Sequence, residues 1–247
     1  MLRTASNLKG TSIAATDGDI GSVQDLYFDD LSWTIRYLVV DTGTWLPGRQ
    51  VLISPLSVRP SGTSDAVQVA LTKNQVEHSP SVDADKPVNR RYEEEYARYY
   101  GYPQYWSGPY RWGASPYAGE TMVPAGAPAP RRTKAPRDRA LRSVRDVTGY
   151  YIEATDGDIG HVEDFMIDDR EWAIRYMIVD TRNWWPGKKV VVSPDWIRKV
   201  SWRESKVFVD LSREGVKTAP EYDPDHPMQR EYETRLFHHY GRPNYWE

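Results

Sequence analysis

The sequence of 247 residues contains no cysteine, which excludes disulfide bonds, thiolate nucleophiles and cysteine-ligated zinc. It also has no run of about 18 apolar residues, the length that a helix needs to cross a membrane. The first ten residues, Met1 to Gly10, have no apolar core behind a basic start, so the sequence predicts no secretory signal. We therefore expect a cytoplasmic protein of bacterial type.

Recognisable catalytic motifs are also missing. The sequence has no Gly-x-Ser-x-Gly elbow, no phosphate-binding loop, no dinucleotide glycine fingerprint and no His-Glu-x-x-His pair. Phenylalanine is scarce, with 4 Phe against 10 Trp and 17 Tyr. Because Trp and Tyr combine an apolar ring with a polar edge, they often lie half-buried or at interfaces. This composition favours a binding protein over an enzyme, and we expect no cofactor.

The sequence contains two copies of one long segment. Residues Ala15–Gly21 recur letter for letter as Ala154–Gly160, and the closing residues Tyr100–Trp106 match Tyr240–Trp246. Matching over the whole length of both copies indicates duplication of a complete folding unit, since solenoid repeats have periods of about 20 to 50 residues. The sequence therefore predicts two domains of the same fold.

A segment rich in Gly, Ala and Pro separates the two copies, and such a composition does not sustain a helix or a sheet. We predict a first domain over residues 1–106, an extended linker over 107–142 and a second domain over 143–247. Both domains are acidic, whereas the linker is basic.

The basic residues of the linker include Arg131, Arg132 and Lys134, which could contact nucleic acid or an anionic membrane surface. Because phosphate would repel the acidic domains, a solvated linker is the favoured interpretation. Nucleic acid is therefore not favoured as a partner, and any membrane contact is expected to be peripheral.

Within one copy, short segments rich in β-forming residues alternate with tight turns. Asp17-Gly18 predicts a hairpin turn, and Pro55 is expected to begin a short strand after the fourth strand. Two helices are expected next, over Thr72–His78, with Thr72 as the N-cap, and over Asp85–Tyr100. Six short strands followed by a helical tail predict a small barrel.

Three elements of the first copy, the hairpin Asp17–Asp25, the acidic turn at Asp29 and the strand Ile35–Asp41, are similar to those of the PRC-barrel family. The family is named for the cytoplasmic domain of the photosynthetic reaction-centre H subunit. The matching elements of the second copy are Asp156–Asp164, Asp168 and Ile174–Asp180. The resemblance implies a mainly β fold with two small PRC-type β-barrels, each followed by a short helical tail. It also implies action by docking onto other proteins, without catalysis.

Acidic residues in the hairpins are weak candidates for a metal site, because paired carboxylates bind hard cations. An EF-hand-type loop would end in Glu, however, where this chain has Phe28 and Ile167, so turn-forming aspartates are favoured. None of the five histidines occurs in both copies, which argues against a shared histidine site. The candidate metal ligands are Asp17, Asp19, Asp156 and Asp158.

Some charged pairs and loop residues do recur. Arg36 with Asp41, and Arg175 with Asp180, are expected to form salt bridges. Tryptophans stand in the loop before a Pro-Gly turn in each copy, where an exposed ring needs cover from the helical tail or from a partner. These interaction candidates are Trp45, Trp184 and Trp185.

The function favoured by these patterns is that of a non-catalytic adaptor in a protein assembly. Its partner is expected to be an unidentified protein, or the chain's own second copy through a pseudo-two-fold pairing. The alternatives are binding to an anionic surface through the basic linker, and an enzyme of unrecognised type.

Overall fold

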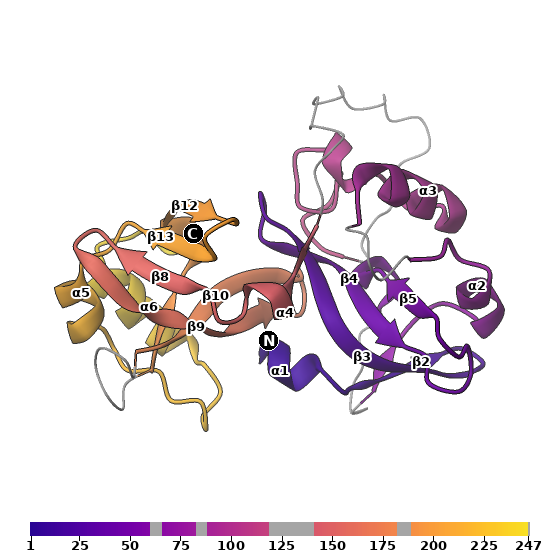
Figure 1. Ribbon diagram of the computed structural model, residues 1–247, viewed down its shortest axis with the longest axis horizontal. Helices are drawn as coiled ribbons and strands as arrows, with labels where there is room; N and C mark the ends of the chain where they lie inside the picture. Colours follow the sequence, from indigo (N-terminus) through magenta and orange to yellow (C-terminus); the bar gives the residue numbers. More distant parts are fainter. Residues whose placement is uncertain (60–65, 83–87, 119–140, 182–188, 247) are drawn as a thin grey trace. The chain divides into compact units, whose positions relative to one another are not determined.

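The computed structural model describes residues 1–59, 66–82, 88–118, 141–181 and 189–246, and these form two compact units (Figure 1). Unit 1 contains Met1, Ala5–Arg145 and Asp168–Ala173. Unit 2 contains Leu2–Thr4, Asp146–Ile167 and Ile174–Glu247. The described residues form 13 strands and a few short helices, which confirms the mainly β fold. No described helix has the length and apolar character needed to span a membrane.

The strands of unit 1 follow one another as antiparallel neighbours. The hairpin predicted at Asp17-Gly18 is present and joins the first two of them. A further strand runs parallel to the first of them. These strands are β2 (Ser12–Ala15), β3 (Gly18–Asp29), β4 (Thr34–Asp41), β5 (Gln50–Ile53) and β6 (Val67–Gln68).

Strands β3 and β4 approach closely at Gly21. This glycine has a φ of +132°, and a Cβ added to it would lie 2.0 Å from the carbonyl oxygen of Asp41. The equivalent Gly160 of unit 2 has a φ of +128°, and a Cβ added to it would lie at the same distance from the carbonyl oxygen of Asp180. Only glycine fits this backbone contact, which explains why the final glycine of the repeated hairpin motif recurs.

Short helices complete unit 1: α1 (Ala5–Leu8), the 3-10 helix η1 (Pro55–Ser57), α2 (Lys73–Glu77), α3 (Arg90–Tyr100) and the 3-10 helix η2 (Tyr105–Ser107). The strand expected to begin at Pro55 is therefore wrong. Ser54 caps this segment by accepting a hydrogen bond from the backbone of Leu56, and proline at the first helical position favours a helical turn. The predicted N-cap of α2, Thr72, is confirmed and forms a capping box with Gln75.

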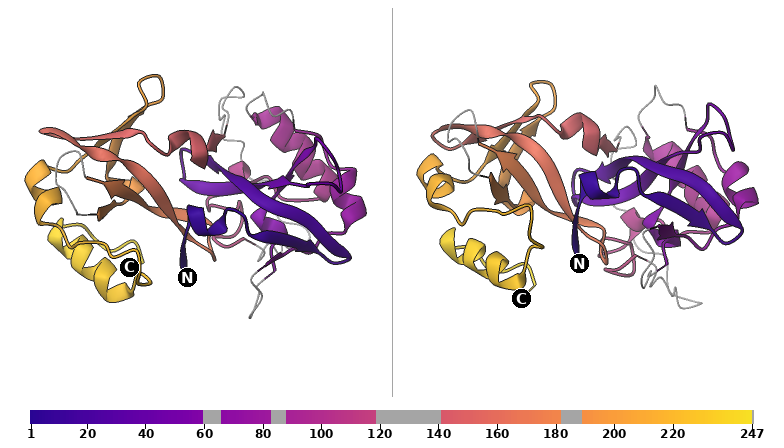
Figure 2. Two further views of the ribbon diagram at one scale, coloured as in Figure 1. Left: turned by 60° about the horizontal axis from the view of Figure 1, so that its bottom comes forward. Right: turned by 90° about the horizontal axis from the view of Figure 1, so that it is seen from below.

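Helix α3 begins at Arg90, later than the sequence pattern indicates, because the side chain of Asn89 caps its first turn. Tyr92, Tyr96 and Tyr100 of this helix lie in or pack against the core of unit 1. Figure 2 gives two further views of the ribbon of this unit. Tyr96 lies in the core beside Tyr37 and Leu52. Its hydroxyl donates to the carbonyl of Leu52 at 3.0 Å and accepts the amide of Ser54 at 3.1 Å. This helix therefore fixes the tail of the unit against β5.

Unit 2 repeats the same order of elements. Its antiparallel strands are followed by a strand that runs parallel to the first of them. One additional strand, β12, pairs with β13. The elements are α4 (Val144–Val147), which begins in unit 1, β8 (Tyr151–Ala154), β9 (Gly157–Asp168), β10 (Ala173–Asp180), β11 (Lys189–Val192), η3 (Pro194–Trp196), β12 (Ile197–Ser201), β13 (Lys206–Val209), α5 (Arg213–Thr218) and α6 (Arg230–His239).

The leading strands of the two sequence copies are exchanged between the units. Strand β1 (Leu2–Thr4) begins the first copy but belongs to unit 2, where it pairs with β9. Strand β7 (Arg142–Ser143) begins the second copy but belongs to unit 1, where it pairs with β3. The two units are therefore not continuous segments of the sequence.

The first part of the expected linker belongs to the folded structure of unit 1. Trp112 is 1% exposed, and its indole nitrogen donates to the carbonyl of Glu171 at 2.8 Å. Arg111 forms an ion pair with the carboxylate of Glu171 at 3.4 Å. These contacts correct the expectation of an extended linker for residues 107–118, since a large aromatic ring is buried there. Residues 119–140 lie outside the described part of the chain.

Candidate functional site

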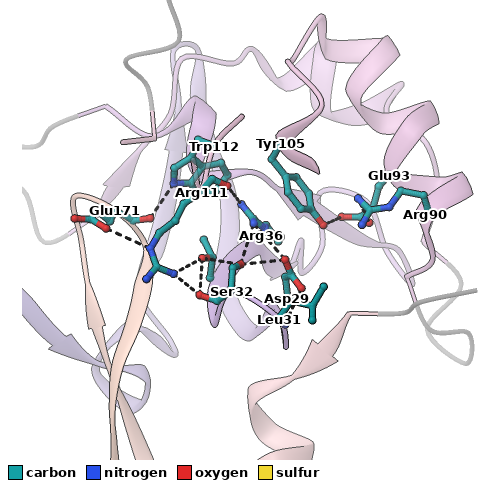
Figure 3. A network of polar contacts seen from close by, with 11 residues as sticks. Asp29, Leu31, Ser32, Arg36, Arg90, Glu93, Tyr105, Arg111, Trp112 and Glu171 are labelled. Carbon is teal, nitrogen blue, oxygen red and sulfur yellow. Dashed lines mark hydrogen bonds and ion pairs between the residues drawn. The ribbon is translucent and has the colours of Figure 1, made fainter. Parts of the chain in front are cut away.

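Five residues of unit 1 form a polar cluster where the tail meets the sheet, and Figure 3 labels all of them except Trp106. Arg36 lies on β4, Arg90 and Glu93 lie on the first turn of α3, and Tyr105 and Trp106 lie on η2. We call this set the unit 1 cluster. Its equivalents, the unit 2 cluster, are Arg175, Arg230, Glu233, Tyr245 and Trp246.

Glu93 is the centre of the unit 1 cluster and is 1% exposed. One carboxylate oxygen accepts the Tyr105 hydroxyl at 2.7 Å, and the other lies 3.2 Å from a guanidinium nitrogen of Arg90. The guanidinium of Arg90 lies 3.9 Å from the centre of the Trp106 ring. A buried carboxylate is stable only when such partners offset its lost hydration. Glu93 thus ties α3 to the tail.

Arg36 lies on the other side of Tyr105, with its guanidinium carbon 3.5 Å from the centre of that ring. Its nitrogens contact Asp29 at 3.4 Å, the hydroxyl of Ser32 at 3.1 Å and the carbonyl of Arg111 at 2.6 Å. The expected pairing of Arg36 with Asp41 is therefore replaced by one with Asp29. The side chain of Asp41 instead accepts the amide of Gly43 at 2.9 Å, within its own turn.

The two carboxylates near Arg36 have shifted pKa values of opposite sign. Burial raises the pKa of Glu93 to about 7, an effect that Arg90 and the Tyr105 hydrogen bond only partly counter. Burial also acts to raise the pKa of Asp29, but the charge of Arg36 and hydrogen bonds from Leu31 and Ser32 outweigh it, so this pKa is lowered. Arg36 thus lies near one acid that stays ionised, Asp29, and one that titrates near neutrality, Glu93.

The unit 2 cluster has the same geometry. The Tyr245 hydroxyl donates to Glu233 at 2.8 Å, and Arg230 lies 3.0 Å from the other oxygen of that carboxylate. Arg230 stands 4.0 Å from the centre of the Trp246 ring, and Arg175 stands 4.2 Å from that of Tyr245. Two independent stretches of sequence therefore build the same arrangement of stacked arginines, glutamate and aromatic tail.

The free space beside the unit 1 cluster is a cavity of about 20 Å³, bordered by Arg36, Glu93, Tyr96 and Trp106 among others. Such a volume holds about one water molecule. The cluster therefore joins secondary-structure elements and leaves no room for a substrate-sized ligand in this cavity.

A wider and more open hollow of about 530 Å³ lies on unit 2, between the end of α5 and the face of α6. Its lining includes Arg235, His238 and His239. The two histidines correspond to Arg98 and Tyr99 in the first copy, so the histidine lining of the hollow is not shared by the two copies.

The hairpin aspartates act as helix caps. A side-chain oxygen of Asp17 accepts the amide of Lys73, the first residue of α2, at 2.8 Å. Asp156 accepts the amide of Arg213 at the start of α5, at 2.7 Å. The remaining two metal candidates, Asp19 and Asp158, are exposed. The described residues include no group of three or more His, Cys, Asp or Glu side chains placed to hold a metal ion.

Of the predicted interaction residues, only Trp45 lies in the described part of the chain. Its ring is half-buried, and the ammonium group of Lys73 lies 4.7 Å from the ring centre. A side chain of α2 therefore partly covers Trp45. The interaction candidates outside the described residues are Trp184, Trp185, Arg131, Arg132 and Lys134.

Sequence reasoning missed the two clusters because their members are far apart in the chain. A usable signal was present, since the pairs Arg90 with Glu93 and Arg230 with Glu233 recur at the same place in both copies. Recurrence of charged residues in both copies is therefore the sequence signal that identifies the clusters.

Comparison with known families identifies residues 2–69 as a PRC-barrel domain. This range covers the strands of the first copy from β1 to β6, together with α1 and η1. The resemblance to this family is thus confirmed for residues 2–69 of the first copy. No curated protein matches the chain.

Proposed function

We propose that this protein is a non-catalytic adaptor built from two PRC-barrel domains, the second formed by the second sequence copy. In this proposal each fold resembles the cytoplasmic domain of the photosynthetic reaction-centre H subunit. The duplicated polar cluster carries the proposal. In both units the recurring charged residues contact one another and the aromatic tail, so duplication has preserved groups that fix the shape of the domain.

A fixed tail matters to an adaptor because a preorganised surface loses less conformational entropy when it binds. Buried ion pairs add little net stability, but they define one arrangement of the groups around them. The unit 1 cluster thus holds Tyr105 and Trp106 in one position relative to α3. This supports a role in presenting a surface of constant shape.

Trp45 is the contact residue that we propose for the partner. It recurs in the second copy as Trp184, its ring is half-buried, and the exposed residues Gly43 and Thr44 precede it. Tryptophan is strongly enriched among residues that dominate binding energy at interfaces. A loop tryptophan shielded in part by one lysine side chain is available to a partner that displaces Lys73.

Site-specific photocrosslinking in living cells tests this proposal. A photoreactive phenylalanine analogue replaces Trp45 in the full chain, and a control chain carries it at Leu31, which is 68% exposed. We expect a discrete protein adduct from position 45, recovered with the cytoplasmic fraction, and none from position 31. Absence of an adduct at position 45 in a correctly folded chain would rule out this contact surface.

Binding to an anionic surface through the basic residues Arg131, Arg132 and Lys134 is the alternative. It predicts binding of the purified chain to anionic vesicles or nucleic acid that weakens steeply as salt is raised. The adaptor proposal predicts no such binding, so a vesicle and nucleic-acid titration at two salt concentrations separates the two.

A further inference from the structure

The edge of β3 in unit 1 binds a segment that lies more than 100 residues further along the chain. Strand β7 pairs with it in antiparallel fashion, with Ser143 opposite Tyr27 and Arg142 opposite Phe28. The amide of Leu141 donates to the carbonyl of Val88 at 2.9 Å. The backbone of β7 therefore extends the sheet in the manner of a bound peptide.

A buried carboxylate on β3 recognises this segment. Asp25 is 2% exposed, and it accepts the Ser143 hydroxyl at 2.5 Å and the amide of Arg145 at 3.2 Å. It also accepts the amide of Leu26, which is a local contact. Because a buried charge is costly without hydrogen-bond donors, Asp25 depends on the 143–145 segment for much of its stabilisation.

Further contacts give the segment its sequence requirements. Val144 is buried, and Leu141 packs against the core of unit 1. Arg142 forms an ion pair with Asp30 at 3.3 Å. The edge of β3 thus accepts an apolar residue, a basic residue and a hydroxyl residue in succession, followed by a small apolar residue.

The first copy supplies the same pattern to unit 2. Leu2-Arg3-Thr4 aligns with Leu141-Arg142-Ser143, and Asp164 aligns with Asp25. Strand β1 pairs with β9, the equivalent of β3. Two units with matching acceptor edges thus each hold a Leu-Arg-Ser/Thr segment from the other sequence copy.

We propose that the β3 edge around Asp25 is a strand-accepting site whose ligand is the Leu-Arg-Ser/Thr segment that begins a copy of this domain. Nothing in the contacts requires the donor to be joined covalently to the acceptor, so a second copy of the chain can supply it. This is the arrangement from which domain-swapped assemblies form. The proposal does not rest on the adaptor function.

Peptide competition on the full chain tests the site. A protease site is inserted within residues 119–140, and the folded chain is cleaved there. We expect the two halves to co-elute on size exclusion, because each unit holds a strand of the other half. A peptide of residues 140–148 should compete with β7 for the β3 edge and bind the cleaved chain, whereas a scrambled peptide should not bind.

Peptide variants isolate the recognition by Asp25 without altering the fold of the acceptor. A Ser143→Ala peptide loses the hydroxyl and should bind about tenfold more weakly or worse, as expected for a hydrogen bond to a charged group. A Ser143→Thr peptide, which copies the residue found at Thr4, should retain the affinity. The proposal is overturned if the folded halves separate on cleavage and do not bind the peptide. It is also overturned if the Ala and Thr peptides bind with equal affinity.

Discussion

The titration of Glu93 makes the stability of unit 1 depend on pH in a direction opposite to that of an ordinary ion-paired carboxylate. Burial raises the pKa of Glu93 from 4.5 to about 7 in the folded state. Between these values the folded protein retains a proton that the unfolded chain has released, so stability falls as pH rises. The contribution of Glu93 to the stability of unit 1 is fully present below about pH 4.5 and is lost as the pH rises through about 7.

The size of the effect follows from the shift. Each unit of pKa corresponds to about 1.4 kcal/mol, so a shift of this size corresponds to about 3 kcal/mol of unfolding free energy. The Glu93→Gln variant cannot ionise and lacks this term. Its stability relative to the wild type should therefore rise by about 3 kcal/mol between pH 4.5 and pH 8, whatever the constant cost of the substitution. Asp29 and the histidines are present in both proteins and cancel in the difference.

Urea unfolding of both proteins at several pH values, followed by tryptophan fluorescence, measures this difference. The matched substitution Glu233→Gln shows which transition belongs to which unit. The assignment of a proton to Glu93 near neutrality would be refuted if the stability of Glu93→Gln relative to the wild type stayed constant, or fell, as pH rises.

Three further substitutions and one control, Gly43→Ala, test the packing by the same unfolding measurement. Gly21→Ala should lower the unfolding free energy by on the order of 3 kcal/mol, because the new Cβ would meet the Asp41 carbonyl. The control Gly43→Ala should lower it by about 1 kcal/mol, because the space around Gly43 is open. Equal losses would contradict the close approach at Gly21. Tyr96→Phe should lose about 1 to 3 kcal/mol, since a buried amide and carbonyl lose their partner, and a neutral result would contradict those bonds. Trp112→Ala should destabilise unit 1 by about 3 to 5 kcal/mol, and no effect would place its segment outside the fold.

Local signals in the sequence predicted local structure well. The Asp17-Gly18 turn, the cap at Thr72 and the repetition of elements all depend on residues close in the chain, and the structure contains each of them. At Pro55 the local signal was ambiguous, because proline begins either an edge strand or a helical turn. The side chain of Ser54 decides in favour of the turn.

Long-range contacts could not be predicted in the same way. Composition indicated an extended linker from residue 107, but burial of Trp112 depends on Glu171, which lies far away in the sequence. The exchange of β1 and β7 leaves no local trace either, since a strand has the same pattern whichever sheet edge it joins. Leu2 and Leu141 occupy equivalent places in the two copies, but the sequence does not show which strand each segment joins.

The duplication allows structural constraints to be separated from candidate functional residues. Gly21 and Gly160 recur because a carbonyl lies against them, and Asp17 and Asp156 recur because they cap α2 and α5. A residue that recurs in both copies is therefore a functional candidate only when packing, capping and hydrogen bonding do not explain why it recurs. Trp45 meets this condition, because its ring is half-buried and the Lys73 side chain covers it only in part. An adaptor contact should consequently be sought at this loop before the buried clusters.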